Sequence, residues 1–209
     1  MKPAGFFKLR PLDLDLGDVI VQVVAVALGV ILGFAVTSWN ERAHQRALLR
    51  ETVATIVGEL RSNQAGMREV TAEHAKSFAI LRQLVGRASA TPTITFADAR
   101  AALRNTGNFR ENVPLSIAWQ IAQTDQGLTL LPFDDRYDVA WIYQVQTLYY
   151  EREERYESSL VTLTESPSGN YFLEVADLAN QLQAVVATER RLDELYTNGI
   201  AHAKKEFKI

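Results

Sequence analysis

Residues 19–39 read VIVQVVAVALGVILGFAVTSW, and this stretch decides the class of structure at the amino end of the chain. It holds 21 residues without a charge, between Asp18 and Glu41. A helix needs roughly 20 apolar residues to cross the hydrocarbon core of a bilayer. Buried helices of soluble proteins are usually shorter, and the apolar region of a signal peptide spans only about 7–15 residues. We therefore predict an uncleaved transmembrane helix, with Trp39 as an aromatic anchor at the membrane interface.

Small side chains recur every four residues within this span. They are Ala25, Gly29, Gly33 and Thr37, and the two glycines form a GxxxG pattern. Positions four apart share one side of a helix, and small residues let two helices approach closely in lipid. Glycine is also simply frequent in membrane helices, which is the alternative reading. We predict that this face associates with a second copy or with another membrane helix.

Orientation rests on the basic residues that flank the span. Lys2, Lys8 and Arg10 precede it, and Arg42, Arg46 and Arg50 follow it, so the two sides are nearly balanced. Cytoplasmic flanks carry the excess of lysine and arginine, whereas long domains are translocated largely regardless of charge. We expect a cytoplasmic tail over 1–18, a span in the inner (cytoplasmic) membrane, and a large extracytoplasmic, periplasmic domain over 40–209.

The segment after the span has the apolar period of a long helix. Steps of three and four residues recur from residue 49 to residue 84, which predicts a helix over 40–86 that continues the membrane helix. The apolar positions of this seam are Leu49, Val53, Ile56, Leu60, Met67, Val70, Leu81 and Leu84. Three polar residues, Asn63, His74 and Ser77, interrupt the seam. They either set register or face loops and water.

The remainder of the chain also predicts helices. Thr95 and Asp98 form a helix-start signature for a short helix over 96–106, and Pro114 suits the first turn of a second short helix over 114–126. The apolar stretch LTLLPF (128–133) is expected to pack as a loop. A helical hairpin over 134–203 completes the chain. The fold class is therefore all-α, with a three- to four-helix bundle outside the membrane.

The junction between span and long helix carries a resemblance. Trp39-Asn40-Glu41 ends the span, and Glu59-Leu60 with Asn63 follows in a leucine-rich amphipathic helix. This arrangement resembles an uncharacterised bacterial family of small single-span membrane proteins, in which a Trp-Asn-Glu-like motif precedes a helical domain of unknown function. The matching part covers about 40 residues, and the segment around Trp119 and Tyr143 resembles the family more loosely. The resemblance implies an architecture and no particular chemistry.

No motif for catalysis, metal binding or a cofactor stands out. Cysteine is absent, and His44, His74 and His202 lack the spacing of a zinc site, so we interpret each as an ordinary helix-surface or seam residue. Asp134, Asp135 and Asp138 suit a helix start, where carboxylates are favourable. The charged run 151–157 is typical of a solvated helix face. We expect no enzyme activity, no cofactor and no metal.

Composition and aromatic placement limit the remaining functions. The chain has a net charge of −3, all of it after residue 39, and so lacks the positive field of nucleic-acid-binding proteins. One group of aromatic residues has two readings, as core or as the lining of a ligand pocket. Its members are Trp119, Trp141, Tyr143, Tyr149 and Tyr150.

Two functional hypotheses follow. The first is a membrane-anchored scaffold or accessory subunit that self-associates or docks on a membrane partner. The second is an extracytoplasmic module that senses a small molecule and acts through a partner protein, because the tail of about 18 residues is too short for an output domain of its own.

Overall fold

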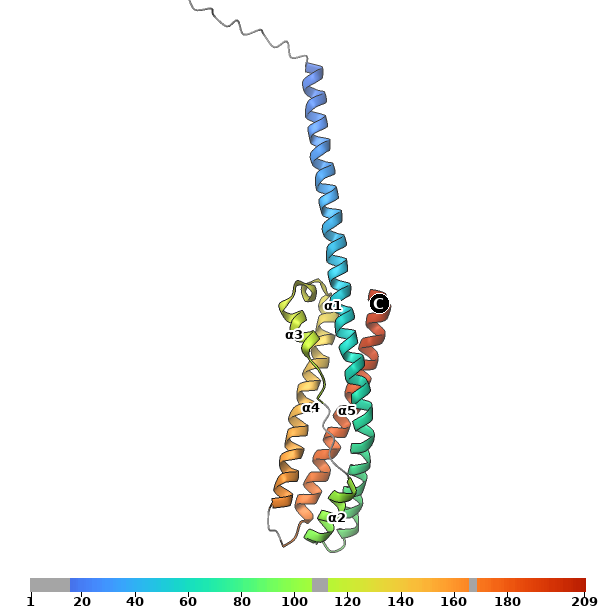
Figure 1. The fold of residues 1–209 in the computed structure, drawn as a ribbon, viewed down its shortest axis with the longest axis vertical. Coiled ribbons are helices and arrows are strands. Elements are labelled where there is room, and N and C mark those ends of the chain that lie inside the picture. Colours follow the sequence, from blue (N-terminus) through green and yellow to red (C-terminus); the bar gives the residue numbers. More distant parts are fainter. Residues whose placement is uncertain (1–15, 107–112, 166–168) are drawn as a thin grey trace, which may run out of the picture. The chain divides into compact units, whose positions relative to one another are not determined.

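The computed structural model describes residues 16–106, 113–165 and 169–209, and every regular element in these ranges is helical (Figure 1). The chain divides into two compact units, Met1–Ala47 and Leu48–Ile209. Helix α1 (Leu16–Ala88) contributes to both units. Most of the predicted tail, residues 1–15, lies outside the described part. The all-α prediction is confirmed.

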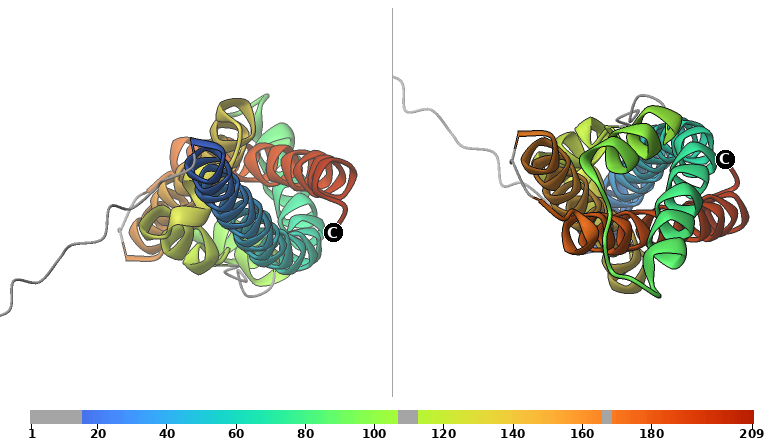
Figure 2. Two further views of the ribbon diagram at one scale, coloured as in Figure 1. Left: turned by 90° about the horizontal axis from the view of Figure 1, so that it is seen from above. Right: turned by 90° about the horizontal axis from the view of Figure 1, so that it is seen from below.

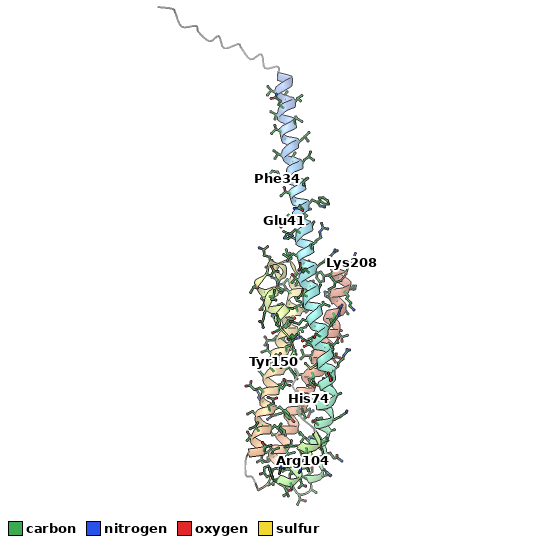
Figure 3. The ribbon with its side chains drawn as sticks, in the orientation of Figure 1. Phe34, Glu41, His74, Arg104, Tyr150 and Lys208 are labelled. Carbon is green, nitrogen blue, oxygen red and sulfur yellow. The ribbon has the colours of Figure 1, made fainter. Side chains whose placement is uncertain are left out.

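The first unit contains the predicted span as uninterrupted helix. All residues of 19–39 are exposed, and the most apolar window of α1 has a mean hydropathy of 2.8 with none of its surface buried. Figure 3 shows Phe34 projecting from this part of α1 into open space. Among the described residues, one helix is long and apolar enough to cross a membrane. A helix that is apolar all round is stable in lipid and unfavourable in water.

The second unit is a helical bundle built on three long helices. Residues of α1 from Leu48 onward, α4 (Phe133–Glu165) and α5 (Phe172–Phe207) run side by side (Figure 2). The backbones of α4 and α5 make the closest approach in the bundle, as expected for an antiparallel hairpin. Seven of the eight predicted seam residues of α1 are buried, and Leu49 is partly buried against the core.

Short elements close the ends of the bundle. Helix α2 (Phe96–Thr106) begins at the predicted Thr95–Asp98 signature, where the Thr95 hydroxyl accepts a hydrogen bond from the Asp98 N–H (3.2 Å) and donates one to the Asp98 carboxylate (2.6 Å). The bond from the Thr95 hydroxyl first, and then a bond from the Thr95 N–H to the same carboxylate (3.2 Å), hold the pKa of Asp98 below its usual value. The Thr95–Asp98 pair therefore anchors the start of α2 by a reciprocal cap.

Two details differ from the sequence prediction. Helix α3 covers only Ile117–Thr124, and residues 113–116 are non-helical, so Pro114 does not open a helix. The connector expected to be a loop contains a 3₁₀ helix, η1 (Gln126–Leu130), whose first N–H donates to the side chain of Asp125. The late start of α3 comes from contacts with α1.

Candidate functional site

The predicted association face lies on the exposed helix of the first unit. Ala25, Gly29, Gly33 and Thr37 are all exposed, and a Cβ atom added to either glycine would meet nothing within 4 Å in the described chain. The Thr37 hydroxyl donates to the Gly33 carbonyl (2.9 Å), so its polar group is satisfied within the helix. Trp39, the predicted interface anchor, is 71% exposed. No described part of the chain therefore covers this face.

The Glu-Leu-x-x-Asn stretch of α1 has a structural task in the bundle. The Asn63 amide accepts a hydrogen bond from the Leu115 N–H and donates one to the Leu115 carbonyl, both at 2.7 Å. One turn earlier, Glu59 accepts from the Ala118 N–H (2.7 Å) near the start of α3. Because the Asn63 side chain pairs with both the N–H and the carbonyl of Leu115, Leu115 does not use these groups in a helix. This is why α3 begins later than predicted.

Further contacts hold the same segment from α4. The Tyr143 hydroxyl donates to the second carboxylate oxygen of Glu59 (2.7 Å), and the Tyr150 hydroxyl donates to the Pro114 carbonyl. The Trp119 and Tyr143 rings stack with centroids 5.2 Å apart and an interplanar angle of 10°. Glu59 and Asn63 therefore join α1, α3 and α4. The seam asparagine does face a loop, the second of its two predicted readings, but it does so through paired hydrogen bonds.

A layer of polar side chains is buried further along the bundle. His74 Nδ1 lies 2.5 Å from Glu189 Oε1, and both side chains are 2% exposed or less. The Tyr149 hydroxyl donates to the carboxylate of Glu153 (2.9 Å), which is 3% exposed. The interpretation of 151–157 as a solvated face is therefore wrong at Glu153, which turns inward. Figure 3 shows where His74 and Tyr150 lie within the bundle.

Burial also changes the acidity of the tyrosines in this core. Desolvation, which disfavours the phenolate, raises the pKa of Tyr156 to about 12. Desolvation first, and then contact with Glu59, raises the pKa of Tyr143 well above its usual value. Desolvation first, and then the charge of Glu153, raises the pKa of Tyr149 in the same way. The hydroxyls of Tyr143 and Tyr149 are structural donors, and all three phenols remain protonated at any ordinary pH.

A cavity of about 340 Å³ opens between α1, α4 and α5. Its walls are mostly aliphatic, and its polar lining consists of Asp135, Asp138, Asn198 and His202. The apolar lining comprises Val53, Ile56, Val57, Leu60, Leu131, Val139, Trp141, Ile142, Leu195, Gly199, Ala203 and Phe207. Small-molecule sites in proteins have about this size, roughly 300–1,000 Å³, and are mostly apolar with a few polar groups.

The aromatic group divides between the two readings. Trp141 lines the cavity and is 46% exposed. Tyr149 is fully buried in the core, and Trp119 with Tyr143 forms the stack beside Glu59. Sequence reasoning missed the cavity itself and its polar residues, because Asp135 and Asp138 read as a helix start and His202 as a surface residue. Asp135 in fact lies 2.7 Å from His202 Nε2, across 67 residues of sequence.

Within the part of the chain that the structure describes, no group of three or more histidine, aspartate or glutamate residues is arranged to hold a metal ion. His44 is exposed on α1, whereas His74 and His202 each contact a carboxylate from another helix. The histidines therefore act as helix-to-helix contacts in two of the three cases.

Comparison with known proteins gives no assignment: no protein-family model, no curated protein and no solved structure matches this chain. The resemblance to a family of single-span bacterial proteins stays a prediction. Function is therefore argued from the geometry alone.

Proposed function

We propose that this chain is a membrane-anchored helical scaffold or accessory subunit, which self-associates or docks on a membrane partner through its span. The observation that carries the proposal is the fully exposed apolar helix over 19–39 with its face of small residues. Lipid satisfies the exposed apolar surface, and the small residues permit close helix packing. The proposal includes no catalytic activity and no cofactor.

The test compares two double variants of the full chain by mass in mild detergent. Gly29→Ile with Gly33→Ile adds bulk to the small face and should convert the assembly to a monomer. Ala27→Ile with Ala35→Ile adds bulk to the opposite side of the same helix and should leave the assembly intact. An assembly of unchanged mass in the glycine variant, or a wild-type monomer without any co-purifying protein, would refute the proposal.

The same proposal places the span in the inner (cytoplasmic) membrane, with the tail in the cytoplasm and the bundle in the periplasm. The chain contains no cysteine, so single cysteines can report topology. A membrane-impermeant maleimide added to intact spheroplasts should label Arg104→Cys and should leave Ala4→Cys unlabelled until the cells are lysed. Labelling of Ala4→Cys but not of Arg104→Cys in intact spheroplasts would mean that the bundle lies in the cytoplasm.

A second candidate function is small-molecule sensing by the bundle, with output through a partner protein. The cavity of about 340 Å³ favours it, because proteins usually fill their cores and rarely keep an apolar space of that size without use. Stabilisation of the bundle by a bound compound in a thermal-shift assay would support this candidate.

A further inference from the structure

The cavity between α1, α4 and α5 has a shape set by small residues of α5. A Cβ atom on Gly199 would lie 3.0 Å from Ile142 Cδ1, so α4 and α5 pack closely at this position. One turn later Ala203 also lines the cavity. Both small residues line the cavity, and a larger side chain at Ala203 would occupy part of its space. An apolar cavity is a poor site for water and a good one for a hydrocarbon group.

The ionisable residues that line this cavity are mostly acidic. Asp135 and Asp138 contribute two carboxylates from the first turns of α4, and His202 is the one ionisable base in the lining. His202 Nε2 is already engaged by Asp135 at 2.7 Å. Asp138 has no hydrogen bond or ion pair with any residue that the structure describes. Among the described residues no lysine or arginine lines the cavity, so the carboxylates outnumber the positive groups there.

Charge and surface together define a ligand class. We propose that the cavity binds a small organic cation, an amine or ammonium group carried on a compact hydrocarbon body. The body contacts the aliphatic walls, and the cationic group lies near Asp138 and Asp135. Trp141 lines the same cavity and offers a ring to the cation. An anion of the same shape is repelled by both carboxylates, and a neutral analogue gains only the apolar contacts.

This inference rests on the second candidate function, ligand binding by the bundle. It is tested with three probes that share one rigid hydrocarbon body: 1-adamantylamine, 1-adamantanol and 1-adamantanecarboxylate. Binding to the full chain in lipid nanodiscs is measured by titration calorimetry, and the signal of empty nanodiscs is subtracted. The amine should bind about ten- to a hundredfold more tightly than the other two, as expected for one charge-assisted contact.

Matched variants assign the effect to the cavity. Asp138→Asn should remove most of the preference for the amine, whereas Asp134→Asn should leave it unchanged. Asp134 lies one turn before Asp138 on α4 and both residues are exposed, but Asp134 does not line the cavity. Ala203→Phe and Val139→Phe add bulk to the cavity from two different helices, so one remains useful if the other fails to fold. Both should abolish binding of the amine.

Two results would overturn the inference in distinguishable ways. Equal binding of all three probes, unaffected by Asp138→Asn but lost in the filled variants, would reject the cationic class and keep the cavity as a ligand site. No binding by any probe, or binding that survives in both filled variants, would reject the site and the second candidate function together. The scaffold proposal is tested separately by the glycine variants and stands or falls without this result.

Discussion

The span and the bundle core are built from the same kinds of side chain with opposite exposure. Val30 in the span is 52% exposed, whereas Leu60 in the bundle seam is 2% exposed. Around Leu60 the apolar residues form a stripe, and polar residues occupy the rest of the helix surface. Around Val30 they surround the helix completely. A helix with one apolar face is stabilised by packing against protein, whereas a helix of this length that is apolar on all sides is suited to lipid.

The largest effect is expected when charged residues are placed in the exposed apolar helix over 19–39. Val26→Arg with Val30→Arg places two cations mid-span, at a cost of about 2.5–3.5 kcal/mol each in membrane insertion. The protein should then be lost from the carbonate-resistant membrane fraction. Val161→Arg is the matched control, because Val161 has the same 52% exposure but lies on the bundle. Retention of the doubly charged span would mean that lipid does not surround it.

The second test removes apolar volume from each region. Leu182 is fully buried in α5, so Leu182→Ala leaves a cavity and should destabilise the bundle by about 2–5 kcal/mol in denaturant unfolding followed by circular dichroism. Leu28 is 54% exposed, and Leu28→Ala should leave the free energy of unfolding of the bundle unchanged. Similar values for the two variants would contradict the separation into two units.

A third test addresses packing precision, which the bundle requires and the exposed helix does not. Gly127 is buried in η1, and a Cβ atom there would lie 1.9 Å from Thr52 Oγ1 on α1. Gly127→Ala should therefore destabilise the bundle by about 1–3 kcal/mol. Gly58→Ala, on α1 with open space around it, should stabilise by about 0.5–1 kcal/mol. A stabilising Gly127→Ala would show that η1 does not dock on α1.

The smallest expected effect is on the unfolding free energy at high pH, where a buried tyrosine and an exposed one should differ. This effect is absent at neutral pH. Tyr156 has a pKa of about 12 in the folded protein and near 10 when unfolded, so only the unfolded chain loses this proton between pH 10 and 12. The stabilisation is complete below pH 10 and is lost as the pH rises through that window. Tyr156→Phe should flatten the decline of unfolding free energy between pH 10 and 12. Tyr137→Phe, at a 61% exposed position, should not.

Local periodicity predicted the long elements because their burial repeats along the chain. The seam from Leu49 to Leu84 and the span over 19–39 both carry that signal in consecutive turns. The polar contacts could not be found in this way. Asn63 and Leu115 are 52 residues apart, and neither neighbourhood marks the other as a partner. The predicted start of α3 at Pro114 was wrong for this reason.

Glu153 and the cavity show two further limits of sequence reasoning. Glu153 stands in a run of charges that resembles a solvated face, but Tyr149, one turn earlier on α4, gives it a buried donor. The cavity is what remains after three helices have packed, so it depends on the helix separation and on the small residues Gly199 and Ala203 together. No short sequence pattern predicts a cavity that forms in this way.

The long reach of the contacts made by α1 has a consequence for synthesis on the ribosome. Gln64 bonds to Asp193, 129 residues later, and His74 meets Glu189 after 115 residues. At roughly 5–20 residues per second, the seam of α1 waits on the order of ten seconds for its partner helix to emerge. The α4–α5 hairpin needs only neighbouring sequence and can form at once. Helix α1 is therefore covered only after the helices that follow it have been made, and during this delay the nascent chain depends on protection from aggregation.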